Sequence, residues 1–196
     1  MKRLLITGFE PFGGETINPA WESVKALPDT LGNYTLYKRE IPVLFGGAPG
    51  RVLEAAAEIS PDGILCIGQA GGREAVTPER IAVNIRDAGI PDNGGMRPEG
   101  QRILEAGDAA YFATVPVEAM ADAIRRAGLP GRVSNSAGTF VCNDTLYTLL
   151  HHFQGSAVRV GFIHVPYLPE QGSPSLALAD TIKALEAAIL ALDTSM

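Results

Sequence analysis

Short apolar runs alternate with amphipathic stretches along the whole chain. This alternation is typical of an α/β domain whose helices cover both faces of a sheet. No internal repeat, low-complexity tract or linker divides the pattern, so we predict a single domain over residues 1–196. The predicted strands are residues 4–7, 34–43, 63–67, 81–85, 133–136 and 158–165. The predicted helices are residues 19–27, 50–59, 117–127, 142–153 and a final one that opens at Ser173-Pro174.

Three local signals add detail to this assignment of strands, helices and loops. Asn18-Pro19 is an N-cap residue followed by proline at the first helical position. The run from Gly63 to Ile67 is continuously apolar, which predicts a central strand buried on both faces. Residues 86–107 are rich in Gly and Pro and form a long loop, a kind of segment that is usually functional or mobile in compact domains.

The net charge and the cysteine content exclude several classes of partner and of bound group. The 16 Lys and Arg against 22 Asp and Glu give a net charge of -6, which argues against nucleic acid or a membrane surface as partner. The apolar run near the N-terminus stops after Ile6, too soon for a signal peptide, so we expect a cytoplasmic protein with reduced thiols. Cys66 and Cys142 form no Cys-x-x-Cys pair, so we expect neither a structural zinc site nor a thioredoxin-type redox site.

The segments that follow the predicted strands carry the candidate chemistry, because open α/β sheets place their sites at strand ends. Residues 8–14 (Gly-Phe-Glu-Pro-Phe-Gly-Gly) match neither a dinucleotide fingerprint nor a P-loop. Phe9 and Phe12 within this loop could form an apolar wall for a flat ligand, or they could simply hold the loop on the core.

A second segment, residues 68–80, combines a Gly-rich turn with ionisable side chains. Its backbone can approach a ligand closely, and Gln69 offers an amide that suits another amide. Glu79 is a candidate catalytic carboxylate, with an ion pair to a neighbouring arginine as the structural alternative.

The remaining two segments suggest a nucleophile and a base. Cys142 stands where a polar loop becomes a helix, a place where the helix dipole lowers a thiol pKa and backbone N–H groups can hold an oxyanion. Cys66, inside an apolar strand, suits a small buried residue instead. His164 ends an apolar strand, and together with Cys142 it forms a candidate nucleophile–base pair.

Together these segments resemble the pyroglutamyl peptidase I (pyrrolidone-carboxylate peptidase) family of cysteine peptidases. The matching motifs are Gly8-Phe-x-Pro-Phe-Gly-Gly, Gly68-x-Ala-Gly-Gly-Arg with Glu79-Arg80, Ser136-Ala-Gly-Thr-Phe-Val-Cys-Asn and Gly161-Phe-Ile-His-Val-Pro-Tyr. The resemblance implies a Glu79–Cys142–His164 triad that removes N-terminal pyroglutamyl residues from peptides through a thioester, without metal or cofactor. It also implies an α/β/α sandwich with a twisted, mixed, mostly parallel sheet.

The same resemblance implies a lactam pocket and a homo-oligomer, either a dimer or a tetramer. The pocket residues would be Phe9, Phe12, Ile90, Phe140 and Val141, with Asn18 and Gln69 as polar contacts. One position departs from the family pattern: Gly89 stands before Ile90-Pro91-Asp92, where many members carry arginine. This departure leaves the role of the long loop open.

Two other function classes remain at this point. A nucleoside-phosphorylase-like or small-molecule-binding domain would use the turn at Gly71-Gly72-Arg73 to hold an anion and would not need Cys142 as a nucleophile. A non-catalytic interaction domain is the third class. Alkylation of Cys142 separates the peptidase from both, because only the peptidase needs that thiol.

Overall fold

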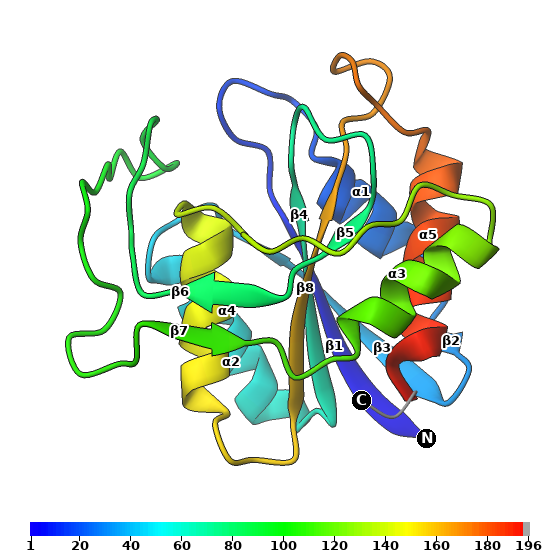
Figure 1. Cartoon of the computed structure of the whole chain (residues 1–196), viewed down its shortest axis with the longest axis horizontal. Coiled ribbons are helices and arrows are strands. Elements are labelled where there is room, and N and C mark those ends of the chain that lie inside the picture. Colours follow the sequence, from blue (N-terminus) through cyan, green and yellow to red (C-terminus); the bar gives the residue numbers. More distant parts are fainter. Residues whose placement is uncertain (194–196) are drawn as a thin grey trace.

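The computed structural model describes residues 1–193 as three layers, with helices on both sides of a central sheet (Figure 1). The strands of that sheet are β1 (Lys2–Phe9), β2 (Thr30–Leu31), β3 (Tyr34–Ile41), β4 (Gly63–Gln69), β5 (Thr77–Pro78) and β8 (Arg159–Val165). Their order is β2-β3-β1-β4-β8-β5. The inner strands run parallel, and the short edge strands β2 and β5 pair antiparallel. The predicted sandwich with a mixed, mostly parallel sheet is confirmed.

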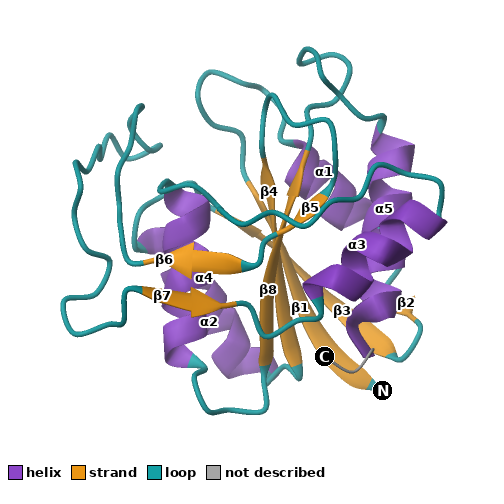
Figure 2. Ribbon diagram, viewed as in Figure 1, coloured by secondary structure: helices purple, strands orange, loops and turns teal. Residues whose placement is uncertain are grey.

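The described helices divide between the two faces of the sheet (Figure 2). They are α1 (Pro19–Ala26), α2 (Gly47–Ile59), α3 (Val117–Arg126), α4 (Val141–His152) and α5 (Leu178–Leu190), followed by a 3-10 turn, Ala191–Asp193. Helices α2 and α4 cover one face, and α1, α3 and α5 cover the other. Side chains alternate between the faces, so Leu5 packs toward α2 and α4 while Leu4 and Ile6 pack on the opposite side.

Where the sequence carries strong local signals, the elements form as predicted. The Asn18 Oδ1 accepts the backbone N–H of Ala20, and Pro19 opens α1. Strand β4 is buried from Gly63 through Gly68, because it lies between two parallel neighbours with helices on both faces.

A two-stranded antiparallel ribbon stands apart from the main sheet. It pairs β6 (Ile81–Val83) with β7 (Ala110–Phe112) and packs on α4. The loop that joins the two strands is tied down, because the Asn84 side chain accepts from the N–H groups of Ile103 and Leu104 and donates to two carbonyls of the same loop. Hydrogen bonds of Asn84 therefore hold the beginning and the end of the long loop together.

Two predicted elements differ from the structure. Residues 133–136 make only isolated bridges, such as Glu79 with Ser134, because the main sheet ends at β5. The final helix begins at Leu178 and not at Ser173-Pro174, which lie in the preceding loop. The Leu and Ile side chains along this helix pack within the chain itself, and Leu185 and Ile189 are fully buried.

Candidate active site

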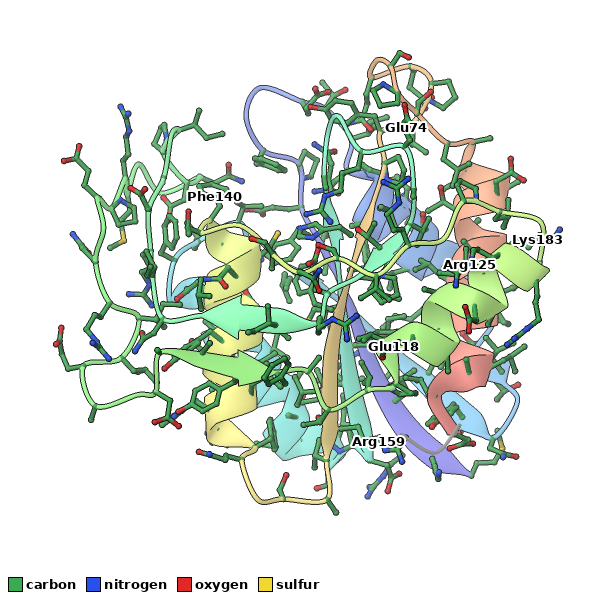
Figure 3. The ribbon with its side chains drawn as sticks, viewed as in Figure 1. Glu74, Glu118, Arg125, Phe140, Arg159 and Lys183 are labelled. Carbon is green, nitrogen blue, oxygen red and sulfur yellow. The ribbon has the colours of Figure 1, made fainter. Side chains whose placement is uncertain are left out.

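Three of the four candidate segments meet at one end of the sheet because the strands that precede them are parallel neighbours. β1, β4 and β8 end at Phe9, Gln69 and Val165, and the loops that follow lie at the same end (Figure 2). The remaining segment, which contains Cys142, leads into α4, with Phe140 immediately before the first turn of that helix (Figure 3). The topology thus joins residues that are far apart along the chain.

Glu79 and His164 form a buried pair at this end. Edge strand β5 pairs with β8 and directs Glu79 toward His164, and the Nδ1 of His164 lies 2.7 Å from the Glu79 Oε1. The same Oε1 accepts a hydrogen bond of 2.6 Å from Arg73, which also contacts the Thr77 hydroxyl and the Ser136 carbonyl. Glu79 therefore makes both the arginine pair and the histidine contact that the sequence offered as alternatives.

The surroundings shift the pKa of both members of this pair. Burial would raise the pKa of Glu79, but the hydrogen bond and charge of His164, together with the Arg73 charge, outweigh it and hold that pKa below its ordinary value. Desolvation lowers the pKa of His164, and the Glu79 carboxylate offsets this only in part. The resting state is accordingly a carboxylate beside a neutral imidazole whose Nδ1–H donates to it.

The Cys142 thiol lies over Gly68 of strand β4, on the face of the sheet to which His164 also points. Gly68 is the register partner of His164, and a Cβ placed at Gly68 would lie 3.0 Å from the Cys142 Sγ and 2.7 Å from Phe162 Cζ. Only glycine leaves room here for the sulfur and the aromatic ring together.

The expected lowering of the Cys142 pKa is wrong for the resting molecule. Desolvation and the nearby Glu79 carboxylate raise the pKa of the thiol to about 12 and so overcome the effect of the helix N-terminus. Cys142 therefore holds its proton until a base removes it.

A small cavity with an empty volume of about 210 Å³ adjoins the thiol. It is lined by Phe9, Phe12, Asn18, Val43, Gln69, Phe140, Val141 and Cys142. The Phe12 and Phe140 rings face each other with centroids 6.0 Å apart, and Phe45 supports Phe140 edge-on at 5.2 Å. Six of the seven expected pocket residues thus lie together.

Ile90 is the exception. It is 47% exposed and does not line the cavity. Val43, which does line it, was missed by the sequence analysis, because it follows the end of β3 and resembles any other core residue.

The polar contacts of the cavity differ in what they can offer a ligand. Asn18 uses its Oδ1 to cap α1 and its Nδ2 to bind the Glu10 carbonyl, so both ends of its amide are engaged. Gln69 accepts from Gln171 at its Oε1, while its Nε2 donates to no residue in 1–193. Of the two amides, only Gln69 has a nitrogen that makes no hydrogen bond within residues 1–193.

A buried ion pair supports the helix that carries Cys142. Asp144, fully buried in the first turn of α4, accepts from Arg86 at 2.7 Å and from the Gly46 N–H at 2.7 Å. Burial raises the pKa of Asp144, partly offset by these two partners. The sequence analysis missed this pair, because nothing in the spacing of residues 86 and 144 links them.

Gly89, the position that departs from the family pattern, lies in the same loop as Arg86. A Cβ added at Gly89 would meet no atom of residues 1–193 within 4 Å. The loop therefore has open space at this position, and a larger side chain would fit there without displacing a neighbour.

Replacing Arg86 by methionine should lower the free energy of unfolding by about 3–5 kcal/mol, because it leaves a buried carboxylate without its counter-charge. The loss should shrink as the pH falls, since protonation removes the unpaired charge of Asp144. Urea unfolding at several pH values measures both effects. The matched control is Arg51→Met, which breaks an exposed pair with Glu54 and should cost no more than about 0.5 kcal/mol. A loss no larger than that of the control would contradict the assignment.

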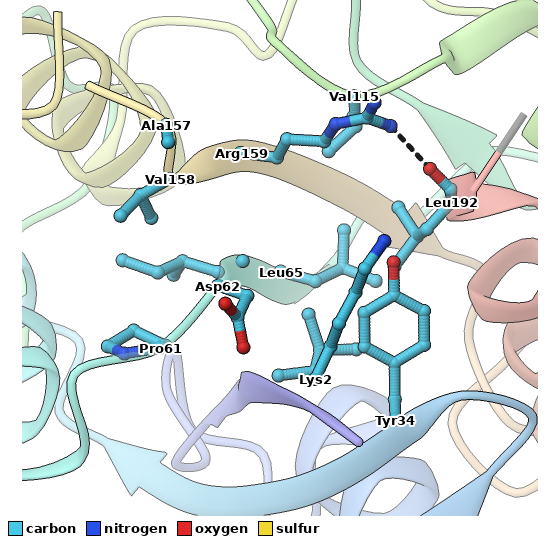
Figure 4. Close-up of a pocket in the computed structure, with 13 residues that line it drawn as sticks. Lys2, Tyr34, Pro61, Asp62, Leu65, Val115, Ala157, Val158, Arg159 and Leu192 are labelled. Atoms are coloured by element: carbon cyan, nitrogen blue, oxygen red, sulfur yellow. Dashed lines mark hydrogen bonds between the residues drawn. The ribbon is translucent and has the colours of Figure 1, made fainter. Parts of the chain in front are cut away.

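A second cavity, with an empty volume of about 700 Å³, opens at the opposite end of the sheet, where the parallel strands begin (Figure 4). Its charged groups are paired within the chain: Arg159 donates to the Leu192 carbonyl, and Lys2 binds Asp193. It is separate from the Cys142 cavity.

Comparison with known proteins identifies relatives that match nearly the whole chain. The sequence model of the pyroglutamyl peptidase family matches residues 2–194. A pyrrolidone-carboxylate peptidase from Levilactobacillus brevis is 51% identical, with 97% of each chain covered, and one from Streptococcus suis is 49% identical, with 97% of this chain and 92% of that protein covered.

Two solved structures extend the comparison to the fold. Bacillus amyloliquefaciens pyroglutamyl peptidase I superposes with a TM-score of 0.95 at 43% identity, covering 98% of this chain and 97% of the other. The pyrrolidone carboxyl peptidase from Thermococcus litoralis gives a TM-score of 0.93 at 40% identity, covering 98% and 93%. With half of its residues shared with such relatives and the same fold throughout, the chain belongs to the pyroglutamyl peptidase family.

Proposed function

We propose that this chain removes the N-terminal pyroglutamyl residue from peptides, with Cys142 as nucleophile, His164 as base and Glu79 as the carboxylate that orients it. The observation that carries the proposal is the 2.7 Å contact of Glu79 with His164, whose register partner Gly68 lies beneath the Cys142 sulfur. Membership of a family of pyroglutamyl peptidases supports the same substrate class.

The reaction follows from the proton positions. The neutral His164 donates its Nδ1–H to Glu79 and so leaves its Nε2 free to take the thiol proton as the sulfur attacks the pyroglutamyl carbonyl carbon. The C–N bond then breaks, the imidazolium gives its proton to the leaving amine, and a thioester remains. Water, deprotonated by the same imidazole, attacks the thioester and releases pyroglutamate and the free thiol.

The oxyanion would be held by backbone groups at the start of α4. The first N–H groups of a helix have no partner within it, and no side chain in residues 1–193 caps this helix at Phe140. Cys142 belongs to that first turn, so the carbonyl oxygen of its acylated form lies within reach of these donors.

The pH profile is the first prediction. Because His164 must be neutral to act as base and desolvation lowers its pKa, the acid limb of kcat/KM should have a midpoint below 6.5, the ordinary histidine value. Activity is present above that midpoint and lost as the pH falls through it. Hydrolysis of a pyroglutamyl coumarin amide across the pH range measures the midpoint. A midpoint above 6.5 would contradict a neutral, desolvated base.

Specificity gives the direct test of the proposed function. A pyroglutamyl ring is a neutral lactam, whereas an N-terminal proline carries a charge that a cavity walled by Phe9, Phe12 and Phe140 would have to desolvate, at a cost of several kcal/mol. Losing the hydrogen bond to the lactam carbonyl adds about 1–3 kcal/mol. The pyroglutamyl coumarin amide should therefore be preferred over the prolyl one by more than about a thousandfold in kcat/KM. Comparable values for the two substrates would overturn the proposal.

The geometry favours the peptidase over an anion-binding domain. Arg73, the residue that would hold an anion, already contacts Glu79, Thr77 and the Ser136 carbonyl. Its guanidinium supports the carboxylate, and both of its terminal nitrogens are already engaged within the chain. Stoichiometric alkylation of Cys142 with iodoacetamide should abolish function entirely, which an anion-binding or interaction domain would not require.

The proposal extends to a cytoplasmic location and a homo-oligomer, dimer or tetramer. Both cysteines of the described chain are free thiols, which suits a reducing compartment. None of the described helices is long and apolar enough to span a membrane. Phe112 of β7, which is 67% exposed, and the exposed Ile85, Ile90 and Met96 of the loop between β6 and β7 offer apolar surface for contacts between subunits. Sedimentation showing only a 20.7 kDa species would contradict the oligomer.

A further inference from the structure

Gln171 lies outside the cavity, in the loop between β8 and α5, yet its side chain reaches the cavity wall through Gln69. Its Oε1 accepts the backbone N–H of Leu168 at 3.0 Å. Its Nε2 donates to the Gln69 Oε1 at 2.9 Å and lies 3.4 Å from the Ile17 carbonyl. Gln171 thus joins the end of β4 to the loops that follow β1 and β8.

The backbone contacts decide which way both amides point. An N–H group only donates and a carbonyl only accepts, so Leu168 and Ile17 fix the orientation of the Gln171 amide. The Nε2 of Gln171 then donates to Gln69, and Gln69 can accept this hydrogen bond only with its carbonyl oxygen. The amide of Gln69 is therefore held with one orientation, and its Nε2 is the end left for a ligand.

We propose that Gln171 is a specificity-determining positioning residue, which locks the Gln69 amide so that the cavity presents a hydrogen-bond donor to the lactam carbonyl. The inference rests on the proposed function, since it names the element that makes the cavity select a lactam. If the Gln69 amide turned over, its oxygen would face the lactam oxygen, and a hydrogen bond would be replaced by repulsion between two acceptors.

Two substitutions of Gln171 separate orientation from simple contact. In Gln171→Leu the Gln69 amide loses its partner and can turn, so kcat/KM for the pyroglutamyl coumarin amide should fall roughly tenfold. In Gln171→Glu one carboxylate oxygen still accepts from Leu168, and the other requires a donor from Gln69, which turns the amide over. The glutamate variant should therefore lose about a hundredfold or more, although it is the closer match in size.

A double-mutant cycle tests whether Gln171 acts through Gln69. Gln69→Leu should reduce activity by itself, and adding Gln171→Leu to it should cost nothing further, because no amide remains to be oriented. Fully additive losses would overturn the inference. The matched control is Gln154→Glu, an exposed residue after α4, which introduces the same charge and should leave kcat/KM unchanged.

A binding measurement tests the inference without relying on turnover, and it includes a control for folding of the variants. The neutral lactam 2-pyrrolidone should protect Cys142 from iodoacetamide, and the concentration for half protection should rise in the order wild type, Gln171→Leu, Gln171→Glu. Alkylation without the lactam should proceed at the wild-type rate, which shows that the variants are folded around an intact thiol. Equal protection in all three proteins would overturn the inference. A wild-type protein that neither binds the lactam nor cleaves the substrate would instead overturn the proposed function.

Discussion

Replacing Cys142 by serine should reduce kcat/KM for a pyroglutamyl coumarin amide by about 10⁴-fold or more, the scale seen when a nucleophile that acts together with its base is removed. The reason is the difference in pKa between the nucleophile and the base that must deprotonate it. The pKa of a serine hydroxyl is far above that of a thiol, while desolvation makes His164 a weaker base than an ordinary histidine. The variant then has almost no attacking anion. Helix α4 should remain intact, because the change replaces one atom at a half-buried position.

The matched control for this prediction is Cys66→Ser. Cys66 is fully buried in β4 and packs in the core toward α2 and α4. Its substitution should lower the melting temperature while kcat/KM stays close to the wild-type value. Circular dichroism and thermal melting of both variants separate lost chemistry from lost folding. Activity retained in Cys142→Ser, or lost only in Cys66→Ser, would contradict the assignment of the nucleophile.

Replacing Glu79 by glutamine should lower kcat by about 10³–10⁴-fold and leave KM nearly unchanged, by analogy with the loss of a triad carboxylate. Arg73 and His164 both contact the Oε1 of Glu79, so a glutamine oxygen at this position can still accept from both. The NH₂ then takes the position of Oε2, which has no hydrogen-bond partner in residues 1–193, and the imidazole keeps its tautomer. The substitution removes the charge that stabilises the imidazolium formed during the reaction.

Glu74→Gln provides the comparison for Glu79→Gln. Glu74 is an exposed carboxylate on the same segment (Figure 3) that takes no part in the contact between Glu79 and His164. Neutralising it should leave kcat within a few fold of the wild-type value. A rise in KM with an unchanged kcat in Glu79→Gln would make Glu79 a substrate contact and remove it from the triad. Substrate titrations with both variants give the two parameters separately.

The sequence alone determined the elements whose signals are local. Asn18 and Pro19 start α1 because a capping side chain and a fixed φ act within one turn, and β4 is recognisable because a strand buried on both faces must be apolar throughout. The positions of the motifs around Phe9, Gln69 and Phe140 indicated candidate sites at strand ends, and their resemblance to the pyroglutamyl peptidase family implied that they share one cavity.

Tertiary structure decided the properties that depend on residues far apart in the chain. The pKa of Cys142 rises because the thiol is packed over Gly68 and near Glu79, two effects that helix position alone does not reveal. The exclusion of Ile90 from the cavity depends on how the long loop is tied. The orientation of Gln69 depends on a hydrogen bond from Gln171, 102 positions away. Local patterns fix where an element begins, but burial, charge and hydrogen-bond polarity at a site are set by neighbours that only folding brings into contact.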